Sequence, residues 1–173
     1  MNGYLVVLAS KSRYLQNPLN TKYKGVDRLP PYSPNIQEDK QALDAYVFGD
    51  FKDDTGVIPQ YDKAKQLLDL FGESRHKFEI IYCESVSAAG VTSNRKGDLR
   101  FLGHDVAASG GGFWSIVGDF PVEKEMRHFL EALNESGLFN ASSDAEAFLQ
   151  EYCTRKLADY DSALEILGVY AFT

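Results

Sequence analysis

Short apolar runs, separated by polar and glycine-containing segments, predict that this chain forms a β-sheet. Runs rich in β-branched and aromatic residues occur at 4–9, 77–85, 98–108 and 165–172. Such runs are typical of strands. Glycines interrupt the segment between the second and third runs, so we expect these two strands to pair as an antiparallel hairpin. We expect the run at 165–172 to close the sheet.

Two segments before the second strand have the apolar spacing of amphipathic helices. The first spans 36–48, and the second spans 60–71 with Gly72 as its C-cap. The segment 17–35 contains several prolines, which exclude a regular helix, and we expect a loop there.

Two more helices are expected in the C-terminal part of the chain. The first spans 121–136, because a proline opens it and Gly137 suits its C-terminal end. The second begins at 142 or 143 and continues to about residue 160. Ser143 and Glu146 have the spacing of a capping box at its start. The segment 113–117 fits either a short strand or a helical turn.

The order of elements indicates the fold class. A strand, two helices, two strands, two helices and a final strand predict an α+β fold. We expect residues 1–173 to form a single domain, in which helices pack against a central, mostly antiparallel sheet.

Composition agrees with a cytoplasmic protein that has an ordinary apolar core. Hydrophobic residues make up 44% of the 173 residues. No run approaches the roughly 20 apolar residues of a membrane span, and the first apolar run is too short for a signal peptide. We therefore expect no contact with a membrane. The lone cysteines, Cys83 and Cys153, fit a reducing compartment, and we expect both to be buried.

Charge is distributed unevenly along the chain. Residues 1–118 contain 14 basic and 14 acidic residues, whereas residues 119–173 contain 4 basic and 11 acidic residues. An acidic excess of this kind repels nucleic acid and attracts basic partners. A solvated acidic surface with no partner has the same composition. The more specific interpretation is a docking face for a basic protein, such as a nuclease that itself binds phosphates.

The strongest chemical pattern is the strand that carries His104 and Asp105 and ends at Gly110, Gly111 and Gly112. Neighbouring residues on a strand point to opposite faces, so the histidine and the aspartate are not expected to form a catalytic pair. Alternation instead places His104 on the same face as Leu102 and Val106. No zinc, calcium or nucleotide-binding motif is complete, and we expect neither a metal nor a cofactor.

The stretch FLGHDVAASGGGFWSIV and the later LNESGLF resemble a family of small bacterial immunity proteins from polymorphic and contact-dependent growth-inhibition toxin systems. The resemblance implies a non-enzymatic inhibitor that binds a cognate toxin domain, often a nuclease, and blocks its active site. The matching positions are Leu102, Gly103, Asp105, Val106, Ala107, Gly111, Phe113, Trp114, Ser115, Ile116, Leu133, Asn134, Gly137, Leu138 and Phe139.

Two hypotheses of function follow. In the first, the protein binds a basic toxin domain through its acidic C-terminal part, with Trp114 as an aromatic anchor. The acidic residues of that expected footprint are Glu123, Glu125, Glu131, Glu135, Asp144, Glu146 and Glu151. In the second, the chain is a small ligand-binding or hydrolytic enzyme domain that uses His104, Asp105 and the glycines at 110–112.

Overall fold

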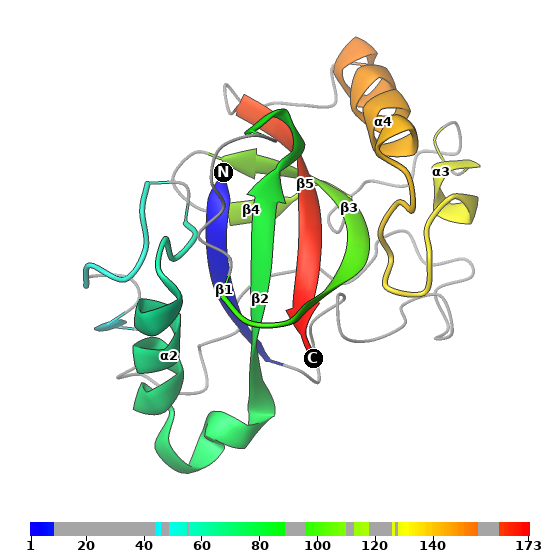
Figure 1. Ribbon diagram of the computed structural model, residues 1–173. Coiled ribbons are helices and arrows are strands. Elements are labelled where there is room, and N and C mark those ends of the chain that lie inside the picture. Colours follow the sequence, from blue (N-terminus) through cyan, green and yellow to red (C-terminus); the bar gives the residue numbers. More distant parts are fainter. Residues whose placement is uncertain are drawn as a thin grey trace.

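The computed structural model describes residues 1–8, 44–45, 49–54, 56–88, 96–109, 113–117, 126, 128–155 and 163–173. Five strands in these residues form one sheet in the order β1-β2-β5-β3-β4, and all neighbours are antiparallel (Figure 1). With the helices that pack on this sheet, the α+β prediction is confirmed. The strands are β1 (Asn2–Leu8), β2 (Phe78–Ser85), β3 (Leu99–Ser109), β4 (Phe113–Ser115) and β5 (Ala163–Phe172).

The expected hairpin between β2 and β3 is wrong, because β5 lies between these two strands (Figure 1). β5 is therefore the central strand, and the edges of the sheet are β1 and β4. Its middle residues Leu167, Gly168 and Val169 are buried. A strand buried on both faces belongs in the interior of a sheet, where both of its backbone edges are hydrogen-bonded. The segment 113–117, which the sequence left open, begins with the short strand β4.

The helix expected at 60–71 is confirmed as α2 (Tyr61–Leu70). Gly72 follows its C-cap with φ +51°, a left-handed conformation that glycine adopts at little cost. Two 3₁₀ helices flank β2, η1 (Gly72–Lys77) and η2 (Val86–Ala88). Only residues 44–45 of the expected helix 36–48 are described, and they are helical. The expected loop 17–35 lies outside the described residues.

The helix expected at 121–136 is wrong in its C-terminal part, because α3 contains only His128–Glu131. A turn closed by a bridge between Leu133 and Phe139 follows it. In this turn the side-chain oxygen of Asn134 accepts the backbone N–H groups of Ser136 and Leu138 at 2.9 and 3.2 Å. Asparagine competes in this way with helical hydrogen bonds. Residues 121–125 lie outside the described part of the chain.

The next helix, α4 (Ser142–Thr154), begins where the sequence predicts and ends earlier, with Arg155 as its C-cap. Its N-cap is Ala141, and no side chain caps it, so the expected capping box of Ser143 and Glu146 is wrong. Cys153 is exposed on this helix, contrary to expectation, whereas Cys83 is buried. No helix in the described ranges is long and apolar enough to cross a membrane.

α2 and α4 pack against opposite ends of the same face of the sheet (Figure 1). Under α2, the core contains Tyr4 and Val6 of β1, together with Leu67. Under α4, the core contains Val106 and Phe148. The other face carries a third cluster, made of Leu5, Ile81, Cys83, Leu102, Ala107, Leu138, Leu167, Val169, Ala171 and Val57. The part of the first face between the two helices is where the candidate site lies.

Candidate partner-binding face

Four aromatic side chains form a row across the sheet between α2 and α4. The strand register places Tyr4 of β1 opposite Tyr82 of β2, Tyr82 opposite Tyr170 of β5, and Tyr170 opposite Phe101 of β3. Successive ring centroids are 5.0, 6.0 and 5.2 Å apart. These spacings lie in the range of favourable aromatic pairs. We call these four residues the aromatic row.

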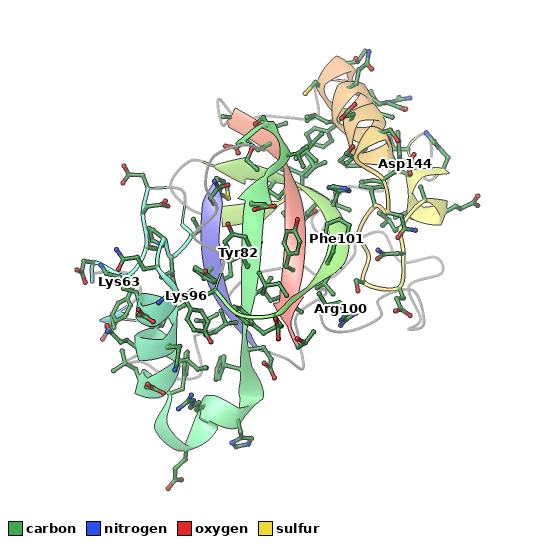
Figure 2. All side chains as sticks on the ribbon, in the orientation of Figure 1. Lys63, Tyr82, Lys96, Arg100, Phe101 and Asp144 are labelled. Carbon is green, nitrogen blue, oxygen red and sulfur yellow. The ribbon has the colours of Figure 1, made fainter. Side chains whose placement is uncertain are left out.

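Exposure increases along the aromatic row from α2 towards α4. Tyr4 and Tyr82 are buried, Tyr170 is partly buried, and Phe101 is 44% exposed. Figure 2 labels Tyr82 and Phe101, which lie on the sheet between the two helices. Among the described residues, Phe101 is the one large hydrophobic residue whose side chain is exposed. Aromatic side chains of this kind can act as anchors where a partner covers them.

The neighbouring row on the same face holds Glu84, Gly168 and His104. A Cβ atom on Gly168 would stand 3.2 Å from Cε2 and Oη of Tyr170, so the tyrosine ring occupies the space that a side chain would need. From there the Tyr170 hydroxyl donates a hydrogen bond to Glu84 at 3.0 Å. The Tyr82 hydroxyl donates to the other carboxylate oxygen at 3.4 Å. The two tyrosines thus hold the Glu84 carboxylate in place beside the aromatic row.

His104 lies at the opposite end of this second row, with its ring 5.0 Å from that of Phe101. Its Nδ1 atom is buried and has no hydrogen-bond partner among the described residues. Burial lowers the pKa of His104, and the negative charge of Glu146 on α4 partly offsets this. The charge of Glu146 thus acts on His104, whose ring is the neighbour of Phe101.

A β-bulge between Phe101 and Gly103 places Phe101 and His104 on the same face. The expectation that His104 shares its face with Leu102 is therefore wrong, because one extra residue in a strand inverts the alternation. Leu102 packs instead in the cluster on the opposite face. Sequence alternation alone did not reveal Phe101 as a surface residue. The glycine inside the strand is the signal for such a bulge.

Asp105 is fully buried on the face opposite His104. Its Oδ1 atom accepts the hydroxyl of Ser115 at 3.0 Å and the backbone N–H of Val106 at 2.9 Å. Asp105 also contributes, after burial itself, to the raised pKa of the Cys83 thiol. His104 and Asp105 thus do not form a catalytic pair, as strand alternation predicts. The glycines at 110–112 lie outside the described residues.

The two stretches that carry the resemblance meet in space. An added Cβ atom on Gly103 would stand within 3 Å of atoms of Leu138, Asn134 and Phe139. Asn134 donates from its side chain to the carbonyl of Leu102 at 2.8 Å, and His104 and Phe139 exchange backbone hydrogen bonds of 2.7 and 2.9 Å. The matching residues that are described therefore serve mainly to pack the fold.

The structure describes five of the seven acidic residues of the expected footprint. Glu131, Glu135 and Glu146 are exposed and Asp144 is partly exposed, and within the described part of the chain none of the four forms an ion pair. Glu151 instead pairs with Arg155 at 2.8 Å and with His128 at 3.5 Å. Figure 2 labels Asp144 at the start of α4.

The acidic residues of α3 and α4 lie at one end of the molecule because aromatic contacts join these elements. The ring of Phe148 lies 5.3 Å from that of Phe129 and 5.6 Å from that of Phe139. No lysine or arginine occurs between residues 128 and 154. By contrast, the α2 end has mixed charge, with the pairs Lys63–Asp50 and Lys96–Asp62. We call Glu131, Glu135, Asp144 and Glu146 the acidic end.

The structure describes only the backbone of one further expected site residue, and it does not describe two others. Glu123 and Glu125 lie outside the described residues. For Trp114 the backbone is described, and it pairs with Ala108 in the sheet. In the described ranges, no group of three or more histidine, cysteine, aspartate or glutamate side chains is placed to hold a metal ion.

Comparison with known proteins adds no relative. No family model matches the chain, and neither a curated protein nor a solved structure matches it.

Proposed function

We propose that this protein is a cytoplasmic immunity protein, which binds a cognate toxin domain with nuclease activity and neutralises it by covering its active site. The observation that carries the proposal is the combination of the acidic end, on the helices and turn at one end of a sheet face, with the exposed ring of Phe101 on the same face. The four carboxylates of the acidic end have no ion-pair partners among the described residues, and the ring of Phe101 is 44% exposed.

Charge complementarity explains why a nuclease is the partner. A nuclease that binds phosphates has a basic surface around its active site. The acidic end provides the opposite charge, which accelerates encounter and orients the two proteins. Because nucleic acid carries the same sign of charge as the acidic end, this surface excludes nucleic acid as the ligand.

Affinity in such a complex comes from a few buried side chains rather than from the whole contact area. Phe101 and Tyr170 are the described residues best placed for this purpose, because they sit at the centre of the face and are only partly covered. Trp114 remains part of the proposal as a second anchor.

The test is a protection assay with the domain encoded next to the gene of this protein. The C-terminal domain of the neighbouring gene product is expressed in cells with and without this protein, and growth and nucleic acid integrity are measured. We expect growth arrest and degradation by the domain alone, and protection when both are present. Calorimetry with the purified proteins should give a one-to-one complex that weakens from about 50 mM to about 300 mM salt.

The variant Phe101→Asp tests whether this face makes the contact, because it removes the exposed aromatic ring. Because Phe101 is exposed, the variant should fold, and protection should be lost. Undiminished killing of cells that contain the folded wild-type protein would refute the proposal. A domain without toxicity, or a purified pair that forms no complex, would refute it as well.

A further inference from the structure

The outer side of β3, which faces away from β5, is covered along most of the strand but not at its start. β4 pairs with the end of β3, and His104 exchanges backbone hydrogen bonds with Phe139. Towards the start of the strand this cover stops at Leu102, whose carbonyl accepts the side chain of Asn134 at 2.8 Å. Residues 99–101 therefore have β5 on one side and, within the described part of the chain, no strand on the other.

The backbone groups of Leu99 and Phe101 point towards this uncovered side. The N–H of Thr173 donates to the carbonyl of Asp98 at 3.2 Å, so the backbone of Asp98 faces β5. Backbone groups alternate between the two sides of a strand. Those of Arg100 therefore also face β5, whereas those of Leu99 and Phe101 face away from it, ahead of the bulge. We call the outward N–H and C=O groups of Leu99 and Phe101 the open edge.

The side chains along the open edge can be reached from outside. Phe101 is 44% exposed and Arg100 is exposed, and Figure 2 labels both on β3. Phe101 lies on the face of the aromatic row, and alternation places Arg100 on the other face. A segment that lies along the open edge therefore meets an aromatic ring on one face and a positive charge on the other.

An extended backbone is the ligand that such an edge recognises, because outward N–H and C=O groups of a strand pair with those of another strand. A second copy of this chain fits poorly. If Leu99 paired with Phe101 of the second copy, two Arg100 side chains would lie opposite each other, and like charges in that position destabilise a sheet. If Leu99 paired with itself, Phe101 would lie opposite Gly97, whose φ of +84° is not extended.

We propose that the open edge of β3 binds an extended segment of the partner protein, which adds to the sheet as an antiparallel strand. The residue of this segment opposite Arg100 is acidic, and its two neighbours are β-branched and apolar, so that one of them covers the ring of Phe101. This inference rests on the proposed function for the identity of the partner, whereas the hydrogen-bond pattern of the edge does not depend on it.

The test uses the peptide acetyl-Thr-Val-Glu-Val-Thr-amide as the probe and follows the backbone amides of the full chain by NMR. In the expected register the two valines pair with Phe101 and Leu99, and the glutamate lies opposite Arg100. We expect a saturable shift and slower hydrogen exchange at the amides of Leu99 and Phe101. The exchange of the Arg100 amide, which faces β5, should stay the same.

N-methylated peptides separate pairing of the backbone from contact of side chains. Methylation of the second valine removes an N–H that faces the open edge, so it should weaken binding at least about five-fold. Methylation of the glutamate removes an N–H that points away from β3, and this peptide is the matched control. It should bind within about two-fold of the parent peptide.

A charge exchange tests the register. Arg100→Glu should weaken binding of the peptide about three-fold, and a peptide with lysine in place of the glutamate should prefer this variant. The matched control is Lys65→Glu, which makes the same change of charge at an exposed residue of α2 and should leave both affinities unchanged.

Three results would overturn the inference: no saturable shift at the amides of Leu99 and Phe101, equal binding of the two N-methylated peptides, or a dimer of the free protein in which both amides are protected from exchange. The outcomes are separable from those of the proposed function. A stable toxin complex that leaves both amides unprotected would reject only this edge. Peptide binding without protection of cells would leave the edge and reject the toxin as its partner.

Discussion

Gly103 and Leu138 approach each other so closely that a Cβ atom on Gly103 would stand 2.7 Å from the Cβ atom of Leu138. Gly103 also has φ +146°, where other residues are strained. Gly103→Ala should therefore lower the free energy of unfolding by about 3 kcal/mol, because backbone and turn must both shift.

Gly72→Ala is the matched control for this substitution. Gly72 also has positive φ, +51°, but nothing lies within 4 Å of an added Cβ atom. Gly72→Ala should lower the free energy of unfolding by only about 1 kcal/mol, because backbone strain is its only cost. Urea denaturation of both variants measures the difference. Equal losses in the two variants would show that the close contact between the bulge and the turn at 134–139 adds nothing to the cost of the Gly103 substitution.

A second prediction concerns the buried hydrogen bond between Ser115 and Asp105. Ser115→Ala should destabilise the protein by about 2 kcal/mol, because a buried carboxylate loses a donor. Asp105→Ala should cost about 3 kcal/mol or more, because it removes the acceptor of two buried hydrogen bonds and creates a cavity. In a double-mutant cycle the two losses should not add, since the side chains contact each other. Additive losses would contradict this interpretation.

A third prediction follows from the lowered pKa of His104. Folding lowers this pKa below its ordinary value of 6.5. As the pH falls below that value, the unfolded chain therefore binds more protons than the folded protein. Stability attributable to His104 is therefore present above about pH 6.5 and is lost as the pH falls.

Folding free energies measured at about pH 7.5 and about pH 5.5 test the role of His104. Glutamine does not titrate, so the loss of stability between these two pH values should be smaller in His104→Gln than in the wild type. Glu146→Gln removes the charge that opposes the shift, so it should make the loss larger. The same pH dependence in all three proteins would show that His104 does not contribute.

A fourth prediction concerns the acidic end. Changing its four carboxylates to lysine should slow association with a basic toxin domain at least about ten-fold at low salt, because electrostatic steering is lost. The melting temperature should change little, because within the described structure these side chains form no ion pairs.

The matched control for the acidic end makes the same change in net charge at exposed acidic residues elsewhere, namely Asp54, Glu73, Glu79 and Asp98. When both variants are measured by stopped flow at the same low salt concentration, this variant should slow association much less than the variant of the acidic end. A similar slowing in both variants would mean that net charge matters and its position does not.

The sequence predicts most of the individual elements, because apolar periodicity is a local signal. The strands β1, β2, β3 and β5 and the helices α2 and α4 lie close to their expected positions. The pairing of the strands is not local. Whether β3 pairs with β2 or with β5 depends on which strand is buried on both faces, and periodicity within one strand does not decide this.

The acidic residues of the candidate face are among the site residues expected from the sequence, whereas its aromatic residues are not. Acidic residues at 131–151 are visible in the sequence as an excess of one sign. The aromatic row combines residues 4, 82, 101 and 170, which only the register of four strands brings together. The bulge at Gly103 also turns Phe101 to a face that simple alternation does not give it.

The central position of β5 determines when the sheet can be completed during synthesis. A nascent chain that has emerged only as far as residue 162 can form the pairs β1–β2 and β3–β4, yet no strand among the described residues pairs with both. Such half-sheets expose unpaired edges and are prone to aggregate. β5 therefore has to emerge from the ribosome before the two halves become one cooperative unit, and Tyr170 emerges with that same strand.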